Sequence, residues 1–297
     1  MKVLITGAKG QLGTTLSRMI REGKCALGII GAIYQNCEIT AVDVDELDIA
    51  DFDQVHDFLT ALTPDIIFNC AAMTNVDGCE ENDLLAMKIN AVGPRNLGIL
   101  AAQIGAKLVH ISTDYVFRGD AESPYCEWDI CNPKTIYGKS KLLGEAYVTQ
   151  FCSRYYIVRT AWLYGRTGHN FVKTILRLGS EKDEIRVVND QRGNPTNAED
   201  LAYHLLKLAD STHYGLYHCS GDGECSWFDF AAKIIEYANL DCTVLPCTTE
   251  EYLRPAPRPA FSSLNNSMLK VTVGDEMRPW EAALKQYIKQ SSNGEVL

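Results

Sequence analysis

The amino-acid sequence predicts an α/β protein with a doubly wound parallel sheet and a smaller, discontinuous C-terminal part. Short apolar runs of strand-like composition alternate with segments of helical period from the N-terminus to Thr160. A glycine-rich turn separates the first strand from the first helix. Beyond Gly165 this alternation loosens, and polar or proline-rich loops separate the elements.

Composition narrows the class of function before any motif is considered. The 297 residues are 46% hydrophobic and 22% charged, as in ordinary globular proteins. A formal net charge of −10 disfavours a nucleic-acid partner, because phosphates need a surplus of basic residues. The sequence shows neither a signal-peptide layout nor an apolar run near 20 residues, so we expect a cytoplasmic protein without a membrane partner. The 11 cysteines and 6 histidines lack metal-ligand spacing; we expect no metal site and mostly buried, free thiols.

The first predicted strand, Lys2 to Thr6, leads into Gly7-Ala8-Lys9-Gly10-Gln11-Leu12-Gly13 and a helix. Gly7 permits a tight turn, Gly10 lets a pyrophosphate approach the backbone, and Gly13 lets the helix pack closely on the strand. The helix N-terminus adds N–H groups and a positive dipole end. This context favours a Rossmann-type dinucleotide site. The spacing differs from the usual Gly-x-Gly-x-x-Gly, and a plain turn is the alternative.

Asp43 follows the second predicted strand, Glu38 to Val42, where a carboxylate can accept hydrogen bonds from an adenosine ribose. It would repel a 2′-phosphate and so favours NADH over NADPH. A solvated loop residue is the alternative, and other acidic residues compete for the role: Asp45, Asp48 and Asp51. The apolar insert 23–36 lengthens the distance from the glycines to Asp43 beyond the usual ~20 residues. We expect extra helix or packed loop there and hypothesise a subunit contact, which the mass of a deletion variant in solution would test.

The next units extend the pattern. After a helix over Phe52 to Leu62, the strand beginning at Asp65 opens into Cys70-Ala71-Ala72, where small side chains leave room for a cofactor. A helix over 84–104, interrupted near Gly93-Pro94, carries Asn90. The alternative for Asn90 is a purely structural amide at the kink.

Thr113 follows the strand Leu108 to Ile111, where its hydroxyl lies on the ligand side of a parallel sheet and can bind a substrate carbonyl. A helix cap is the alternative. Further on, Asn132-Pro133 marks a turn into a helix on which Tyr137 and Lys141 share one face. A cation beside a tyrosine lowers its pKa and makes it a proton donor for a carbonyl undergoing reduction. Such pairs also occur by chance in helices.

The C-terminal half is predicted more coarsely. We expect strands over 155–160, 185–189 and 215–220, helices over 171–178, 201–209 and 228–238, and a frayed tail from about Ser291. The stiff loop Arg254 to Pro259 presents two arginines that suit a diphosphate, or that are simply solvated. These elements suggest a dinucleotide-binding domain, 1–160 with 197–222 returning to it, and a substrate-binding domain, 161–196 and 223–297.

Together these motifs resemble the extended short-chain dehydrogenase/reductases, and within them the dTDP-4-dehydrorhamnose reductase family. The general motifs are Gly7-x-x-Gly10-x-x-Gly13, Asn69-Cys-Ala-Ala, Asn90, Ser112-Thr113-Asp114 and Tyr137-x-x-x-Lys141. The closer likeness rests on Leu-Asp-Ile at 47–49, Ser-Thr-Asp-Tyr-Val-Phe at 112–117, Arg-Thr-Ala-Trp-Leu-Tyr-Gly at 159–165, Asn-Asp-Gln at 189–191 and Pro-Thr at 195–196.

The resemblance implies NAD(P)H-dependent reduction of the C4 ketone of dTDP-4-dehydro-β-L-rhamnose to dTDP-β-L-rhamnose. This is the last step of dTDP-rhamnose synthesis and supplies cell-surface polysaccharide. Tyr137 would be the acid, Lys141 its pKa tuner and nicotinamide-ribose ligand, and Thr113 the residue that orients the carbonyl. The implied cofactor-binding residues are Gly7, Gly10, Gln11, Leu12, Gly13, Asp43, Asp48, Ile49, Ala71, Ala72, Met73, Thr74, Asn90, Tyr137 and Lys141. The implied substrate-binding residues are Thr113, Asp114, Tyr137, Trp162, Asn170 and Arg258.

The sequence departs from the family pattern in the insert after Gly23, in Met73 where a histidine is often seen, and in Ala260-Phe261 after the arginine loop. Two other functions stay open. An epimerase or 4,6-dehydratase shares the fold, although dehydratases follow the threonine with Asp-Glu, whereas here Tyr115 follows Asp114. The non-catalytic regulatory subunit of methionine adenosyltransferase also resembles this family. The sequence leaves NADH or NADPH, and monomer or homodimer, undecided.

Overall fold

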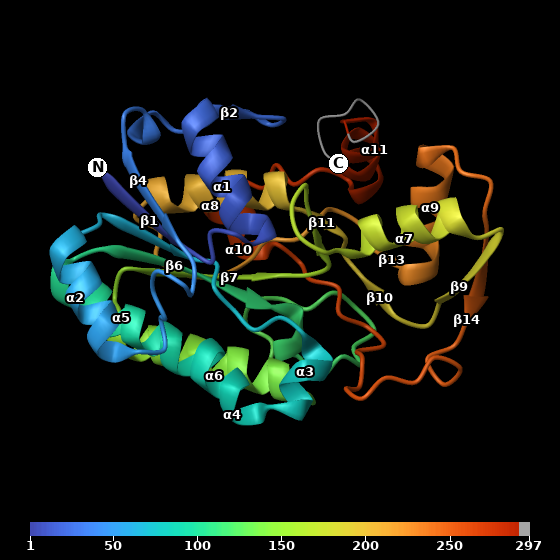
Figure 1. Ribbon diagram of the computed structural model, residues 1–297, viewed down its shortest axis with the longest axis horizontal. Coiled ribbons are helices and arrows are strands. Elements are labelled where there is room, and N and C mark those ends of the chain that lie inside the picture. The colour runs from blue at the N-terminus through green and yellow to red at the C-terminus, as the bar shows by residue number, and fades with distance from the viewer. Residues whose placement is uncertain (291–297) are drawn as a thin grey trace.

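Six parallel strands form the central sheet of the computed structural model, which describes residues 1–290 (Figure 1). The spatial order is β4-β1-β5-β6-β7-β12. Their bounds are β1 (Lys2–Thr6), β4 (Glu38–Val42), β5 (Ile66–Asn69), β6 (Lys107–Thr113), β7 (Tyr155–Thr160) and β12 (Gly215–His218). All pairings in this sheet are parallel, as predicted. The predicted tail from Ser291 lies outside the described residues.

Helices cover both faces of the sheet, so the predicted doubly wound fold is confirmed. One face carries α1 (Gln11–Glu22), α8 (Ala198–Asp210) and α10 (Ser267–Thr272). The other carries α2 (Phe52–Leu62), α5 (Gly93–Ile104) and α6 (Ile136–Phe151). Each face has its own buried apolar core, because the strands alternate side chains between the two faces.

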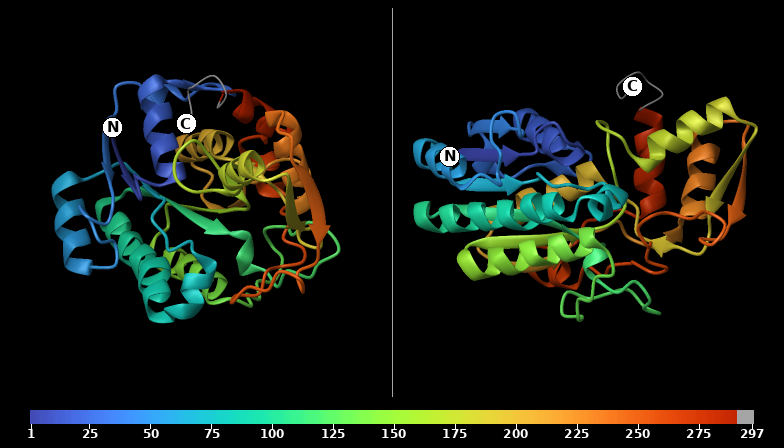
Figure 2. Two further views of the ribbon diagram at one scale, coloured as in Figure 1. Left: turned by 45° about the vertical axis from the view of Figure 1, so that its right-hand side comes forward. Right: turned by 60° about the horizontal axis from the view of Figure 1, so that its bottom comes forward.

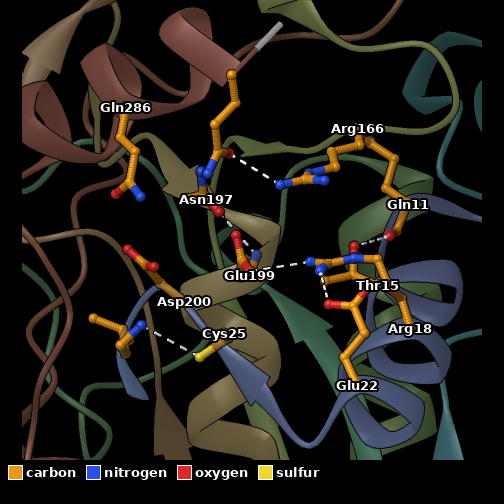
Figure 3. Close-up of polar contacts among 12 residues, drawn as sticks. Gln11, Thr15, Arg18, Glu22, Cys25, Arg166, Asn197, Glu199, Asp200 and Gln286 are labelled. Carbon is orange, nitrogen blue, oxygen red and sulfur yellow. Dashed lines mark hydrogen bonds and ion pairs between the residues drawn. The ribbon is translucent and has the colours of Figure 1, made fainter. Parts of the chain in front are cut away.

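Ion pairs and caps hold α1 against α8 at one end of this packing (Figure 3). Arg18 on α1 pairs with Glu22 at 2.7 Å and with Glu199 on α8 at 3.0 Å. The Asn197 side chain caps α8 by accepting from the Glu199 N–H. The glycine-rich turn that precedes α1 is therefore anchored to a long helix from a distant part of the chain.

The predicted interrupted helix is present and has a specific cause. α3 (Val76–Glu81) and α4 (Asp83–Met87) precede a π-helical turn, Lys88–Val92, which continues directly into α5. Pro94 at the start of α5 has no N–H to donate to the preceding turn, so the helix widens there. A 3₁₀ turn, Asp114–Val116, follows β6.

A second group of elements lies beside the carboxyl ends of the strands (Figure 2). It contains α7 (Phe171–Glu181), β9 (Glu184–Val188), α9 (Trp227–Ala238), β14 (Thr243–Cys247) and α11 (Trp280–Gln290), which share a separate apolar core. β9 and β14 pair in parallel. A short pair links the group to the sheet region: β8 (Leu163–Tyr164), which follows β7, pairs with β11 (Thr196–Asn197), which precedes α8. β10 (Arg192–Gly193) pairs with β13 (Cys225–Ser226) within the group.

The insert after Gly23 contains a short hairpin and then a loop that packs on the core, so of the two expectations the packed loop is confirmed and extra helix is limited to one short turn. β2 (Lys24–Cys25) pairs with β3 (Gly28–Ile29), and a 3₁₀ turn follows over Ala32–Tyr34. Tyr34 is buried and its hydroxyl donates to the Leu206 carbonyl at 2.9 Å. Ile29 at the hairpin is 78% exposed. The subunit-contact hypothesis therefore narrows to the hairpin, because deletion of the whole insert would also remove core residues.

The thiols are free, as expected: all 11 cysteines are unpaired, 5 are buried and 6 are partly exposed. Within residues 1–290, no group of three or more His, Cys, Asp or Glu side chains could hold a metal ion. The same residues contain no helix of the length and apolarity that a membrane span requires.

Candidate active site

The site lies at the point in the sheet where successive strands are added on opposite sides of β1. β1 lies between β4 and β5, and the crevice at the carboxyl ends of such strands is where open α/β sheets bind ligands. Gly7 follows β1 with φ of +65°, and a Cβ there would lie 2.7 Å from the Ala71 backbone nitrogen. At Gly13 a Cβ would lie 2.4 Å from the Gly7 carbonyl oxygen. The turn therefore requires glycine at both positions.

No side chain caps the N-terminus of α1, which begins just after Gly10. The N–H groups of this first turn face the crevice with the positive end of the helix dipole. This uncapped backbone suits an anion, and the pyrophosphate site that the glycine pattern indicates stays a prediction.

A central cavity of about 640 Å³ brings most of the predicted site residues together. It contains the glycine-rich turn, the end of β6, the start of α6 and the segment after β7. The predicted residues that line it are Gly7, Gly10, Gln11, Leu12, Gly13, Ala72, Thr74, Thr113, Asp114, Tyr137, Lys141 and Trp162.

A second cavity of about 510 Å³, here called the Asp43 cavity, shares Gly7, Gly10 and Ala72 with the central cavity. The predicted residues Asp43, Asp48, Ile49 and Ala71 also line it. The competing carboxylates have other partners, because Asp45 pairs with Lys9 at 2.5 Å and Asp51 caps α2. Asp43 itself accepts from the Lys9 N–H at 3.0 Å, which fixes it beside the turn.

Four predicted residues line neither cavity: Met73, Asn90, Asn170 and Arg258, of which Arg258 lines a third cavity described below. The Asn90 side-chain oxygen accepts from the Met73 N–H at 2.9 Å, and its amide nitrogen donates to the Met73 carbonyl at 3.0 Å and to the Ser140 hydroxyl at 3.1 Å. Asn90 therefore connects the loop after β5 to α6. Met73 takes part in this contact through its backbone N–H and carbonyl. Asn170 caps α7 and donates to the Gln11 side chain at 3.1 Å, which joins the glycine turn to the second group of elements.

Tyr137 lies in the first turn of α6, with its ring edge against Tyr115 at a centroid distance of 5.5 Å. It is 9% exposed, and this burial raises its pKa; a hydrogen bond with Thr113 offsets the effect in part. The expectation of a tyrosine pKa lowered by Lys141 is therefore wrong for the protein alone. Desolvation dominates, because the phenolate would lie in an apolar pocket. A tyrosine that keeps its proton is what a reduction requires of its acid.

Lys141 stands one turn after Tyr137 and is 3% exposed. Its ammonium donates to the Ile111 carbonyl at 2.6 Å, and burial lowers its pKa to about 8 while Glu145 opposes this. The side chain is thus held along β6, beneath the central cavity. The position of the ammonium is fixed by this hydrogen bond, whereas its pKa, and therefore its charge, depends on the polarity of what fills the cavity.

Thr113 combines the two predicted roles. Its hydroxyl accepts from the Tyr115 N–H at 3.2 Å, which is the expected cap, and donates to Asp114 at 2.8 Å. It still lines the central cavity beside Tyr137. Asp114 is 4% exposed, and burial raises its pKa from 3.8 to about 6.

Asp114 makes stability depend on pH. Its raised pKa means that the folded state binds this proton more tightly than the unfolded chain, so the charged form opposes folding above pH 6. We expect Asp114→Asn to raise the free energy of unfolding of the cofactor-free protein by roughly 3 kcal/mol near pH 8. The difference should shrink as the pH falls through 6 and vanish below about 4. Urea unfolding of both proteins across this range measures it, and a difference that does not vary with pH would refute the assignment.

Two stacked tryptophans close the far wall of the central cavity. Trp162 has φ of +47°, a strained backbone for a large residue, and its ring lies 3.5 Å from that of Trp227 at 8°. Gly193 leaves room for this stack, since a Cβ there would lie 2.6 Å from the Trp162 ring. Trp162 was predicted and Trp227 was missed, because nothing in the local sequence distinguishes Trp227 from a core residue of α9.

Trp227 and Tyr115 also line a third cavity, of about 490 Å³, here called the arginine cavity. It lies between the second group of elements and the loop 249–259. Besides Arg254 and Arg258 of the predicted arginine loop, its lining includes residues that were not predicted: Arg186, Gln191, Thr249 and Tyr252. Arg258 is partly buried and pairs with Asp77 at 2.9 Å, so the predicted alternative of a simply solvated arginine does not hold for this residue.

Comparison with known proteins agrees with this geometry. A family model described as the RmlD substrate binding domain matches residues 1–293. The chain is 42% identical over 292 residues to the spore coat polysaccharide biosynthesis protein SpsK of Bacillus subtilis, covering 98% of each chain.

Two solved structures are similar over nearly the whole chain. A dTDP-4-dehydrorhamnose reductase from Clostridium acetobutylicum has a TM-score of 0.93 at 48% identity, covering 98% of this chain and 100% of that one. The dTDP-4-dehydrorhamnose reductase of Bacillus anthracis in complex with NADP has a TM-score of 0.91 at 43% identity, covering 97% and 99%.

Proposed function

The chain belongs to the family of the RmlD substrate binding domain, and we propose that it reduces the C4 ketone of dTDP-4-dehydro-β-L-rhamnose with NADH or NADPH. The product is dTDP-β-L-rhamnose, so the reaction is the last step of dTDP-rhamnose synthesis, which supplies polysaccharides. The related reductases from Clostridium acetobutylicum and Bacillus anthracis support the reaction, and the latter's complex with NADP supports the cofactor class.

One observation carries the proposal. A single cavity is lined by the glycine-rich turn and by Thr113, Tyr137 and Lys141. A dinucleotide on the turn and a carbonyl beside the tyrosine would therefore share one enclosed space, as hydride transfer requires.

The residues divide the chemistry between them. A bound NADH or NADPH supplies the hydride. Tyr137 gives its proton to the C4 oxygen as negative charge develops there. The Thr113 hydroxyl, which donates to Asp114 when no substrate is bound, turns its proton toward that oxygen and orients it. Lys141 keeps a positive charge behind the tyrosine and so favours loss of the tyrosine's proton in the transition state.

The nucleotide half of the substrate fits the arginine cavity. Its lining combines apolar and aromatic side chains, which suit a base, with three arginines, which suit a diphosphate. Tyr115 and Trp227 border both this cavity and the central one, so a sugar between them would reach Tyr137. This placing supports a nucleotide-sugar substrate over a small free ketone.

Three related proposals follow from the same reasoning. Residues 1–160 and 197–222 bind the dinucleotide, and residues 161–196 and 223–297 bind the sugar nucleotide. The protein acts in the cytoplasm, as a monomer or a homodimer. Asp43 favours NADH, whereas the Lys9 ammonium in the same cavity suits a 2′-phosphate, so the proposal includes both NADH and NADPH.

The test is spectrophotometric. Purified protein with dTDP-4-dehydrorhamnose is expected to oxidise NADH or NADPH in equal amount to the dTDP-rhamnose formed. Tightly held NAD with no net oxidation would favour an epimerase instead. Dinucleotide binding without turnover of any keto sugar would favour a regulatory subunit.

A further inference from the structure

Asp77 on the short helix α3 holds the arginine loop across the opening between the two parts of the molecule. Its carboxylate accepts from the Ala256 N–H at 3.1 Å and from the Arg258 guanidinium at 2.9 Å. The Arg254 guanidinium lies further off, at 3.9 Å. One carboxylate from the sheet side of the molecule thus fixes the backbone and a side chain of the loop that lines the arginine cavity.

The same helix also contacts the segment that carries the acid. Glu80 accepts from the Ile136 N–H at 2.8 Å, and Ile136 immediately precedes Tyr137 at the start of α6. Val76, at the start of α3, lines the central cavity. α3 therefore has one polar contact with the arginine loop and another with the residue that immediately precedes the catalytic tyrosine.

The three arginines of the cavity are not equally free to bind a ligand. Arg258 is 18% exposed, with one guanidinium nitrogen on Asp77 and another on the Ala256 carbonyl at 3.0 Å. Arg186 is paired with Glu251 at 2.7 Å. Among the described residues, Arg254 is 48% exposed, has a long contact to Asp77, binds the Tyr252 hydroxyl at 3.2 Å and lies 4.8 Å from the Tyr252 ring centroid. Arg254 can turn toward a ligand at the smallest cost in existing contacts.

We propose that Asp77 is a positioning residue for the substrate: it fixes Arg258 and residues 256–258 beside the cavity and leaves Arg254 to bind the diphosphate. The inference rests on the proposed function, because it takes the diphosphate of a nucleotide sugar as the ligand. A loop held in this way needs less ordering when the ligand binds, which strengthens binding without a new contact. Asp77 itself touches neither cofactor nor substrate.

The experiment compares Asp77→Asn with Glu81→Gln, a matched loss of one charge at an exposed position of the same helix. Calorimetry gives the dissociation constant of dTDP, and steady-state kinetics gives KM and kcat for the keto sugar. We expect Asp77→Asn to weaken dTDP binding and raise KM by about ten-fold each, the effect of one lost charge-assisted contact. kcat and NADPH affinity should change less than about three-fold, and Glu81→Gln should match the wild type.

A double-mutant cycle with Arg258→Gln separates positioning from general damage to the fold. If Asp77 acts through Arg258, the double variant should bind dTDP no more weakly than Arg258→Gln alone. Unchanged or tighter dTDP binding by Asp77→Asn would overturn the inference, as would an equal loss of NADPH affinity. If Asp77→Asn does not fold, the cycle is run with Asp77→Ser, which also removes the carboxylate, so the same outcomes apply. A wild-type protein that binds no dTDP and reduces no keto sugar refutes the proposed function itself, which is a distinguishable result.

Discussion

Tyr137→Phe is expected to lower kcat by about 10²–10⁴-fold and to leave the affinity for NADH or NADPH unchanged. The variant loses only the hydroxyl that protonates the C4 oxygen. The ring keeps its edge contact with Tyr115 and its place in the first turn of α6. The lost interaction is made chiefly in the transition state, so the loss falls on turnover and not on cofactor binding.

Single-turnover kinetics measure the chemical step directly, and fluorescence titration measures cofactor affinity. Tyr147→Phe is the control, because Tyr147 lies on the same helix and packs on Phe151 away from the cavities. Near-normal turnover in Tyr137→Phe would refute the assignment of the acid. Because burial raises the pKa of Tyr137, the wild-type acid should not lose its proton at any pH below its ordinary range near 10.

Local patterns were sufficient to predict the sheet and most of the helices around it. The predicted strands 2–6, 38–42 and 155–160 match β1, β4 and β7, since each is a short apolar run between clear breakers. β14 was missed because Pro246 argues against a strand, and it is tolerated in a two-stranded pair. α11 has apolar residues at helical spacing, but its packing surface is the second core, which no local pattern reveals.

The candidate site, like the fold, has residues that local sequence patterns predict and contacts that they do not. Thr113 and Tyr137 could be predicted because they lie at strand ends and helix starts, whose position relative to a parallel sheet is fixed by topology. Contacts between distant segments of the chain could not be predicted. Gln11 and Asn170 are 159 residues apart and bind each other, although each was assigned to a different ligand. Asp77 and Arg258 are 181 residues apart, and nothing in either local sequence indicates the other.

Arg159→Met is expected to lower the free energy of unfolding by about 3–5 kcal/mol, a larger cost than most core substitutions. Arg159 on β7 and Glu145 on α6 form an ion pair at 2.7 Å with side chains 4% and 5% exposed. The Arg159 guanidinium also lies 5.0 Å from the Phe117 ring centroid. Removal of the arginine leaves the Glu145 carboxylate buried without its countercharge, and this desolvated charge accounts for most of the cost.

The double variant Glu145→Gln/Arg159→Met distinguishes this explanation from simple loss of packing. The glutamine amide oxygen still accepts from the Ser112 hydroxyl, which lies 2.5 Å from the carboxylate, and no unpaired carboxylate remains buried. We therefore expect the double variant to be more stable than Arg159→Met alone in urea unfolding; an additive loss would contradict the explanation.

The single variant Arg159→Met should also change the pH dependence of the site. Glu145 lies one turn beyond Lys141 and already opposes the lowering of the lysine's pKa. Without Arg159 its charge acts more strongly on that ammonium, so the pKa of Lys141 should rise and the alkaline limb of the rate profile should move to higher pH.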